Sequence, residues 1–221
     1  MTADERARRA KLLYEQAIFT GDTGPLAAAD RELDAAEADL ALARGRVAHG
    51  RFLVARDAGP AAEDPAELAL FQRAAELYRA LGDERGEAAA LFWAGCFHQV
   101  VRGDDGTAVP LLERSLELAR RVRDEETMAE ALRHLGIAAH RAGRLDEAAD
   151  QLEESSRLRR AAGQPASVAA NLVGLAYIAA AQGHPDQAGE RLAEADRLAA
   201  GAGAHSVRQH VAEARAALLP G

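Results

Sequence analysis

Apolar residues in this chain recur at steps of three and four, which is the spacing of one face of an α-helix. The pattern is clearest over residues 129–162, where two amphipathic stretches are joined by a short turn at Gly143. Neither stretch is apolar enough on all sides to be buried alone, so the pair needs neighbours on both sides. The sequence therefore predicts stacked helical hairpins.

The pattern of this hairpin returns when the sequence is shifted by 40 residues in either direction. The residues in register are Gly103, Gly143 and Gly183; Ala108, Ala148 and Ala188; Leu112, Leu152 and Leu192; Ser115, Ser155 and Ala195; Leu118, Leu158 and Leu198; and, on the first helices, Ala89, Ala129 and Ala169 with Phe92, Leu132 and Leu172. Periods of this size are typical of solenoids, in which small residues let two helices approach closely and leucines fill the space between hairpins. We therefore expect an all-α solenoid.

These positions resemble the tetratricopeptide repeat. The family's small and large positions correspond to Leu132, Leu135, Gly136, Ala139, Ala148, Leu152 and Ser155 in the third copy, and to Leu172, Leu175, Ala176, Ala179, Ala188, Leu192 and Ala195 in the fourth. The second copy departs from the pattern, with Gly95 and Cys96 at the Leu–Gly step and Gln99 at the next small site. The family's usual period is about 34 residues, and the longer period here is similar to that of arrays in bacterial (actinomycete-type) regulators and kinesin-light-chain-like proteins. The resemblance implies a right-handed α-solenoid.

We expect about five hairpins and a C-terminal capping helix in a single domain over residues 1–221. The predicted parts are degenerate hairpins in 1–64, with helices over 4–20, from Gly24 and over 41–57; clear repeats in 65–201, with hairpins over 85–122, 125–162 and 165–201; and the capping helix in 204–219. Asp64 is a residue type that often caps the N-terminus of a helix, and Pro65 is a type favoured at the first helical position. Pro110 lacks an N–H donor and crowds the preceding turn, so we expect an irregular or late start of the helix at 106–122.

In tetratricopeptide arrays, ligands usually bind a concave groove that the first helices of successive hairpins line. Helical geometry places on this face Trp93, Phe97, Val101, Glu130, Arg133, Ile137, His140, Arg141, Val173 and Tyr177. An apolar floor beside a few polar groups is typical of a binding site. For Trp93, the alternative to a place in the groove is packing against the neighbouring hairpin. For Arg133 and Arg141, the alternative to binding a ligand is a solvated ion pair with Glu130 or Asp146.

Composition and charge limit the other functions. The net charge of −8 and the pI of about 5.4 argue against binding nucleic acid or an anionic membrane. No apolar run reaches the ~18 residues that a membrane span needs, so we expect a cytoplasmic protein. Lys11 is the single lysine among 27 basic residues, which with the abundance of alanine indicates a bacterial protein from a high-GC genome. Cys96, the one cysteine, is interpreted as a small core residue rather than a reactive thiol.

Motifs of known catalytic chemistry are absent from the sequence: there is no GxxxxGK[ST], GxGxxG, GxSxG or CxxC. The histidines lack the spacing of metal ligands; His134 and His140, for example, lie about 120° apart on a helix. We therefore expect no catalytic residues, no metal and no cofactor. The favoured hypothesis is a non-enzymatic module that binds a protein or peptide in its groove in a regulatory role. The alternatives are a small-molecule sensor or an unusual biosynthetic enzyme using the same groove, and a scaffold that self-associates into a homo-oligomer.

Overall fold

The computed structural model describes residues 2–219, which form ten α-helices joined by short loops and no β-strand. The all-α prediction is confirmed, and helices that follow one another in the chain pack as hairpins, as in an α-solenoid of repeats. Within these residues no helix has both the length and the apolar character that crossing a membrane requires. The chain divides into two compact units, Met1–Val122 and Arg123–Gly221. The single domain over residues 1–221 stays a prediction.

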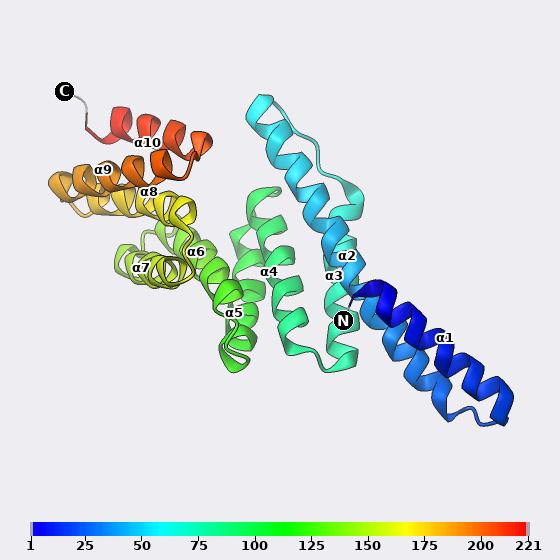
Figure 1. Cartoon of the computed structure of the whole chain (residues 1–221). Helices are drawn as coiled ribbons and strands as arrows, with labels where there is room; N and C mark the ends of the chain where they lie inside the picture. Colours follow the sequence, from blue (N-terminus) through cyan, green and yellow to red (C-terminus); the bar gives the residue numbers. More distant parts are fainter. Residues whose placement is uncertain (1, 220–221) are drawn as a thin grey trace. The chain divides into compact units, whose positions relative to one another are not determined.

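The first unit contains five helices, each of which packs against the next. Figure 1 shows α1 lying along the first half of the much longer α2, whose second half continues beside α3. The helices are α1 (Ala3–Thr20), α2 (Gly24–Ala58), α3 (Pro65–Leu81), α4 (Glu84–Val100) and α5 (Asp105–Arg121). The Asp64 carboxylate accepts a hydrogen bond from the Ala66 N–H at 2.9 Å, which confirms the predicted cap of α3.

The second unit contains two hairpins and a final helix. The helices are α6 (Glu125–Arg141), α7 (Leu145–Ala161), α8 (Pro165–Ala181), α9 (Pro185–Gly201) and α10 (His205–Leu218). The last of these packs on both α8 and α9 (Figure 1) and buries Val211 and Ala214 against them. The predicted capping helix is therefore present.

The sequence-based prediction is wrong at α2, which is one helix of 35 residues rather than two helices meeting near residue 41. Where other hairpins are followed by the next helix, the chain turns through a left-handed residue, with φ of 68° at Gly163 and 65° at Gly203. Arg123 makes the same turn at a φ of 54° although it is not glycine. The corresponding stretch at Leu42 carries good helix formers and no glycine turn. The helix therefore continues, and α2 belongs to both the first and the second hairpin.

Pro110 does not disturb its helix. The three second helices α5, α7 and α9 begin at residues 105, 145 and 185, so α5 starts in register with its counterparts. The expected late start is therefore wrong. The carbonyl that a proline ring crowds belongs to the residue four positions earlier, which here is Gly106, and that glycine has no side chain to add to the crowding.

The first helices do not follow the 40-residue register throughout. Helix α4 begins 41 residues before α6, because the loop of Val101, Arg102, Gly103 and Asp104 is one residue longer than the loops after α6 and α8. The packing follows the same offset: Ser115 Oγ donates to the Ala88 carbonyl and Ser155 Oγ to the Ala129 carbonyl, each at 2.7 Å.

Close helix contacts agree with this register. A methyl group added at Gly95 would lie 2.8 Å from Leu112 Cγ, and one added at Gly136 would lie 3.0 Å from Leu152 Cγ. Ala94 and Gly95 therefore fill the Leu–Gly step of the second copy, which is less degenerate than the sequence suggested.

Candidate functional site

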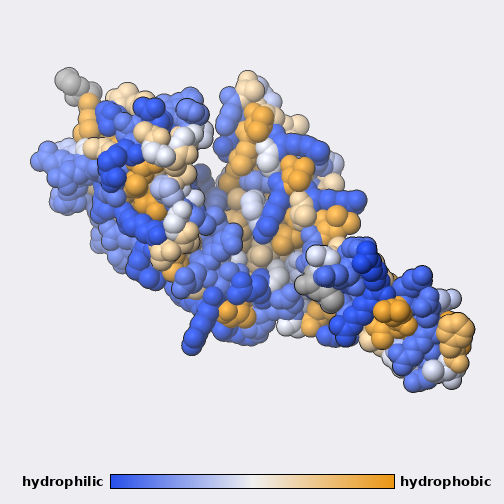
Figure 2. All heavy atoms as spheres, viewed as in Figure 1, coloured by the Kyte–Doolittle hydropathy of each residue, from blue (hydrophilic) through white to orange (hydrophobic). Residues whose placement is uncertain are grey.

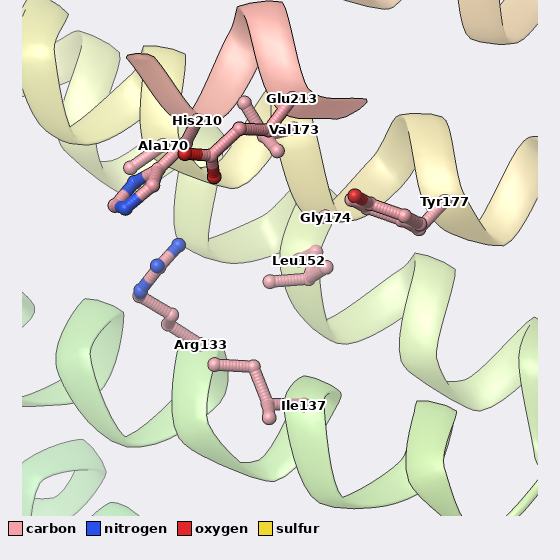
Figure 3. Close-up of a pocket in the computed structure, with 9 residues that line it drawn as sticks. All are labelled: Arg133, Ile137, Leu152, Ala170, Val173, Gly174, Tyr177, His210 and Glu213. Carbon is pink, nitrogen blue, oxygen red and sulfur yellow. The ribbon is translucent and has the colours of Figure 1, made fainter. Parts of the chain in front are cut away.

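A cavity of about 270 Å³ opens between α6, α8 and α10 in the second unit. Its lining residues are Arg133, Ile137, Leu152, Ala170, Val173, Gly174, Tyr177, His210 and Glu213. Figure 3 shows apolar side chains in the middle of this cavity, with Arg133, His210 and Glu213 on one side and the Tyr177 hydroxyl on the other. The cavity therefore has an apolar floor and a polar rim that carries both signs of charge.

Helical periodicity explains why these side chains meet. Arg133 and Ile137 lie four residues apart on α6, and Val173 and Tyr177 lie four residues apart on α8, so each pair shares one helix face. Gly136 of α6 faces Ala148 and Leu152 of α7, which leaves Arg133 and Ile137 on another side of α6. Gly174 keeps the floor open, because even a methyl group there would lie 3.0 Å from Leu152 Cδ1.

A buried polar network holds Arg133 in place. Its Nη1 donates to Asn171 Oδ1 at 2.7 Å, and Asn171 is fully buried. Asn171 Nδ2 in turn donates to Ser155 Oγ at 2.9 Å and Ser156 Oγ at 3.2 Å. The two hydroxyls donate to main-chain carbonyls of α6 and α7. Buried groups satisfied in this way are rigid, so the guanidinium is oriented before any ligand arrives.

The structure brings together four of the residues predicted for the groove: Arg133, Ile137, Val173 and Tyr177. Their role in binding stays a prediction. Three other predicted residues of this unit do not line the cavity. Glu130 instead pairs with the buried Arg159 across 2.8 Å. His140 is half-buried and Arg141 is the exposed last residue of α6.

Trp93, Phe97 and Val101 belong to the first unit and do not line this cavity. The expectation that Phe97 faces a groove is wrong, because its side chain is fully buried. Trp93 is half-buried and stacks on Phe71 of α3, with the ring centroids 5.8 Å apart. This contact agrees with the alternative in which Trp93 packs against the neighbouring hairpin. Val101 follows the last residue of α4.

The physical reason for these errors is the one-residue change of register. A shift of 40 residues aligns Trp93 with Arg133, whereas the helix starts and the serine bonds align Phe92 with Arg133. A shift of one residue rotates a side chain by about 100° around the helix axis. Trp93 is thereby turned toward α2 and α3, where its ring also makes an edge-to-face contact with the His49 ring, with the ring centroids 5.5 Å apart.

A second cluster of chemical groups lies in the core of the first unit. Cys96 Sγ is 3.6 Å from His49 Nε2, and His49 Nδ1 is 2.7 Å from Glu67 Oε1. Burial raises the pKa of the Glu67 carboxyl, and its hydrogen bond with His49 opposes that effect. The exposed fraction is 4% for Cys96, 3% for His49 and 0% for Glu67. This arrangement could activate a thiol in an open site, but here it is enclosed, and Cys96 is a core residue as predicted.

Among residues 2–219, no group of three or more histidine, cysteine, aspartate or glutamate side chains is placed to hold a metal ion.

Besides Gly174, which is the neighbour of the predicted Val173, sequence reasoning missed four residues of the cavity: Leu152, Ala170, His210 and Glu213. A signal for two of them was present. His210 and Glu213 each precede a residue of the apolar stripe of α10, namely Val211 and Ala214, and so lie at the edge of its buried face. Which neighbour that edge would meet could not be read from the stripe.

The comparison with protein families agrees with the repeat pattern. The family model described as tetratricopeptide repeat matches residues 97–161. No curated protein sequence matches this chain. A solved structure described as BtubC (BKLC) from P. vanneervenii is similar, with 18% sequence identity, a coverage of 91% of each chain and a TM-score of 0.49. The family match and the helical hairpins that surround it show that this chain carries repeats of the tetratricopeptide type.

Proposed function

We propose that this chain binds a peptide segment of a protein partner in the cavity between α6, α8 and α10, and that any regulatory role is exercised through that partner. Tetratricopeptide repeats generally mediate protein–protein interactions. The observation that carries the proposal is the make-up of the cavity, in which Ile137, Leu152 and Val173 form an apolar floor next to charged groups. Concave apolar sites with a few placed polar groups are typical binding sites.

The size of the cavity suits one or two peptide side chains. Its volume is about 270 Å³, which is near the lower end of the range of about 300–1,000 Å³ that is usual for pockets enclosing small molecules. A peptide needs to bury only one or two side chains in such a space while its backbone stays at the rim.

The rim supplies groups of both charges for that backbone. Arg133 carries N–H donors suited to carbonyl or carboxylate oxygens, and the Glu213 carboxylate accepts from amide N–H groups. Because Asn171 already fixes the orientation of Arg133, little side-chain entropy is lost when a ligand binds. We therefore expect a bound segment with an apolar anchor and a neighbouring carbonyl or carboxylate.

The test is to select binding peptides from a random library on the full chain and to measure their dissociation constants by fluorescence anisotropy. Val173→Glu places a carboxylate in the apolar floor, and Tyr177→Ala removes a wall; each should weaken binding at least about tenfold. Arg141→Ala is the matched control, since this residue ends α6 outside the cavity, and its affinity should stay within about twofold. Selected peptides that bind the Val173→Glu chain as tightly as the wild type would place the binding surface elsewhere.

A further inference from the structure

One face of α2 carries large apolar residues at a constant spacing. Leu33, Leu40, Val47 and Val54 are seven residues apart and are 48%, 50%, 54% and 74% exposed. A small residue stands three positions after each of the first three, namely Ala36, Ala43 and Gly50, and these small residues are also seven residues apart. Together they form the α2 seam, which consists of Leu33, Ala36, Leu40, Ala43, Val47, Gly50 and Val54. Figure 2 shows apolar side chains among hydrophilic ones over the hairpin of α1 and α2.

A strict seven-residue repeat is not what packing within a hairpin requires. A straight α-helix has 3.6 residues per turn, so an apolar stripe with a repeat of seven stays in contact only with another helix that coils around it. The seam runs from Leu33 to Val54, a length of about 32 Å at 1.5 Å per residue. That is three heptads, which is the minimum typical of a coiled coil.

The charges along α2 are separated into two halves. Residues 24–40 contain five carboxylates and one arginine, whereas residues 41–58 contain four arginines and one carboxylate. The seam is flanked on one side by Asp30 and Glu37 in the first half and by Arg44 and Arg51 in the second. Within residues 2–219, neither of these two arginines has a carboxylate partner, and both are exposed.

We infer that α2 pairs with α2 of a second copy of this chain in an antiparallel coiled coil. In this arrangement Leu40 packs opposite Ala43 of the second copy and Leu33 opposite its Gly50. Each large residue therefore meets a small one, which allows the two helices to approach closely. The same contacts occur twice because the pairing has a two-fold axis.

The flanking charges select the second copy and the direction. With the helices antiparallel, Glu37 lies beside Arg44 of the second copy, and Asp30 lies beside its Arg51. A parallel pair would instead place carboxylate against carboxylate and arginine against arginine, which is unfavourable. Glu37 already contacts Arg73 of α3 at 2.7 Å, and in the dimer it shares its carboxylate between two arginines. A helix that is complementary to itself in both shape and charge needs no other partner.

Sedimentation velocity of the full chain across a dilution series tests the association. We expect the mass to rise with concentration from 23.4 kDa to twice that value. Leu40→Glu with Val47→Glu should weaken dimerisation at least about thirtyfold. Ala27→Glu with Ala28→Glu is the matched control, because it adds the same charge at exposed positions of α2 outside the seam. A wild-type chain that keeps the mass of a monomer throughout, or a dimer that the seam variant does not weaken, would overturn the inference.

Disulfide cross-linking tests the direction. A chain with Leu33→Cys mixed with a chain with Gly50→Cys should cross-link under mild oxidation, whereas the Leu33→Cys chain alone should not. The wild-type chain is the control for its own buried Cys96. Self-cross-linking of Leu33→Cys would show a parallel pair and overturn the antiparallel arrangement.

A charge exchange gives a second test that leaves the apolar seam intact. A chain with Arg44→Glu and Arg51→Glu, and a chain with Asp30→Arg and Glu37→Arg, should each stay monomeric alone and form a dimer when mixed. Self-association of either chain at wild-type affinity would overturn the assigned charge pairs. Circular dichroism of every variant is the check that the helices are retained.

Discussion

Replacing Asn171 by alanine should destabilise the second unit and weaken the candidate site together. Asn171 is fully buried and takes part in three hydrogen bonds, two to serine hydroxyls and one from the Arg133 guanidinium. The serine hydroxyls keep their own donor bonds to main-chain carbonyls, so the substitution leaves no buried hydroxyl without a partner.

The magnitude follows from these bonds. A neutral buried hydrogen bond contributes about 1 kcal/mol and one to a charged group about 1.5–3 kcal/mol. With the incomplete additivity of bonds in one network, we expect the free energy of unfolding to fall by about 3 kcal/mol. At a urea dependence of about 2 kcal/mol per molar, the midpoint of denaturation followed by far-UV circular dichroism shifts by about 1.5 M.

The matched control is Gln182→Ala, which removes an exposed amide that donates to Asp146 at 2.8 Å directly after α8. Its loss should stay below about 0.5 kcal/mol. Peptide affinity should fall in Asn171→Ala and not in the control, because only the former removes the hydrogen bond from Arg133 to Asn171. An Asn171→Ala chain that loses less than about 1 kcal/mol, or no more than the control, would show that the network does not support the hairpin.

Further predictions concern backbone packing and pH. Gly45→Ala should destabilise the first unit by about 2–4 kcal/mol in urea denaturation, because its methyl group would lie 2.4 Å from Phe71 Cε1 in the core; Gly189→Ala makes only ordinary contacts and should stabilise by about 0.5–1 kcal/mol. Burial, aided by Arg102, lowers the pKa of His98 below its usual 6.5. The unfolded chain therefore takes up a proton that the folded chain resists, so stability is lost as the pH falls through about 6.5. His98→Gln should reduce this loss between about pH 7.5 and 5.5, and an unchanged pH profile would contradict the assignment.

The hairpins were predictable because their limits are set locally. The starts of α5, α7 and α9 follow the 40-residue period, and Gly103, Gly143 and Gly183 each have the positive φ that a turn at a helix end needs. The apolar stripe of α10 was equally visible. Glycine turns and apolar stripes depend on neighbours in the sequence, so no tertiary information was needed.

The site was predictable only in part. Arg133, Ile137, Val173 and Tyr177 share faces that helical geometry defines, and the structure gathers them around one cavity. The polar partner of Arg133 could not be predicted, because Asn171 is 38 residues away and its meaning depends on how α8 docks on α6. His210 and Glu213 were missed for the same reason, since they join the cavity only through the docking of α10.

The error at Trp93 shows how sensitive a surface assignment is to loop length. A repeat period predicts helices well even when one loop gains a residue, because an amphipathic pattern tolerates a boundary shift. It predicts helix faces poorly. One added loop residue shifts the register of the neighbouring helix by one position, and this rotates each of its side chains by about 100° from the direction that the period predicts. The buried serine bonds to Ala88 and Ala129 fix the register that the period alone left ambiguous.

The two candidate surfaces have one origin in how the helix junctions are made. Where a left-handed residue joins a hairpin to the next helix, as at Gly163 and Gly203, the chain turns back, and α6, α8 and α10 line up around a cavity. At Leu42 the chain has no such residue, so two helices fuse into α2, and the fused helix keeps an outer face long enough for three heptads. A glycine turn introduced at this junction would shorten the seam and should therefore abolish self-association while sparing peptide binding in the second unit. Loss of both activities together would contradict the assignment of two separate surfaces.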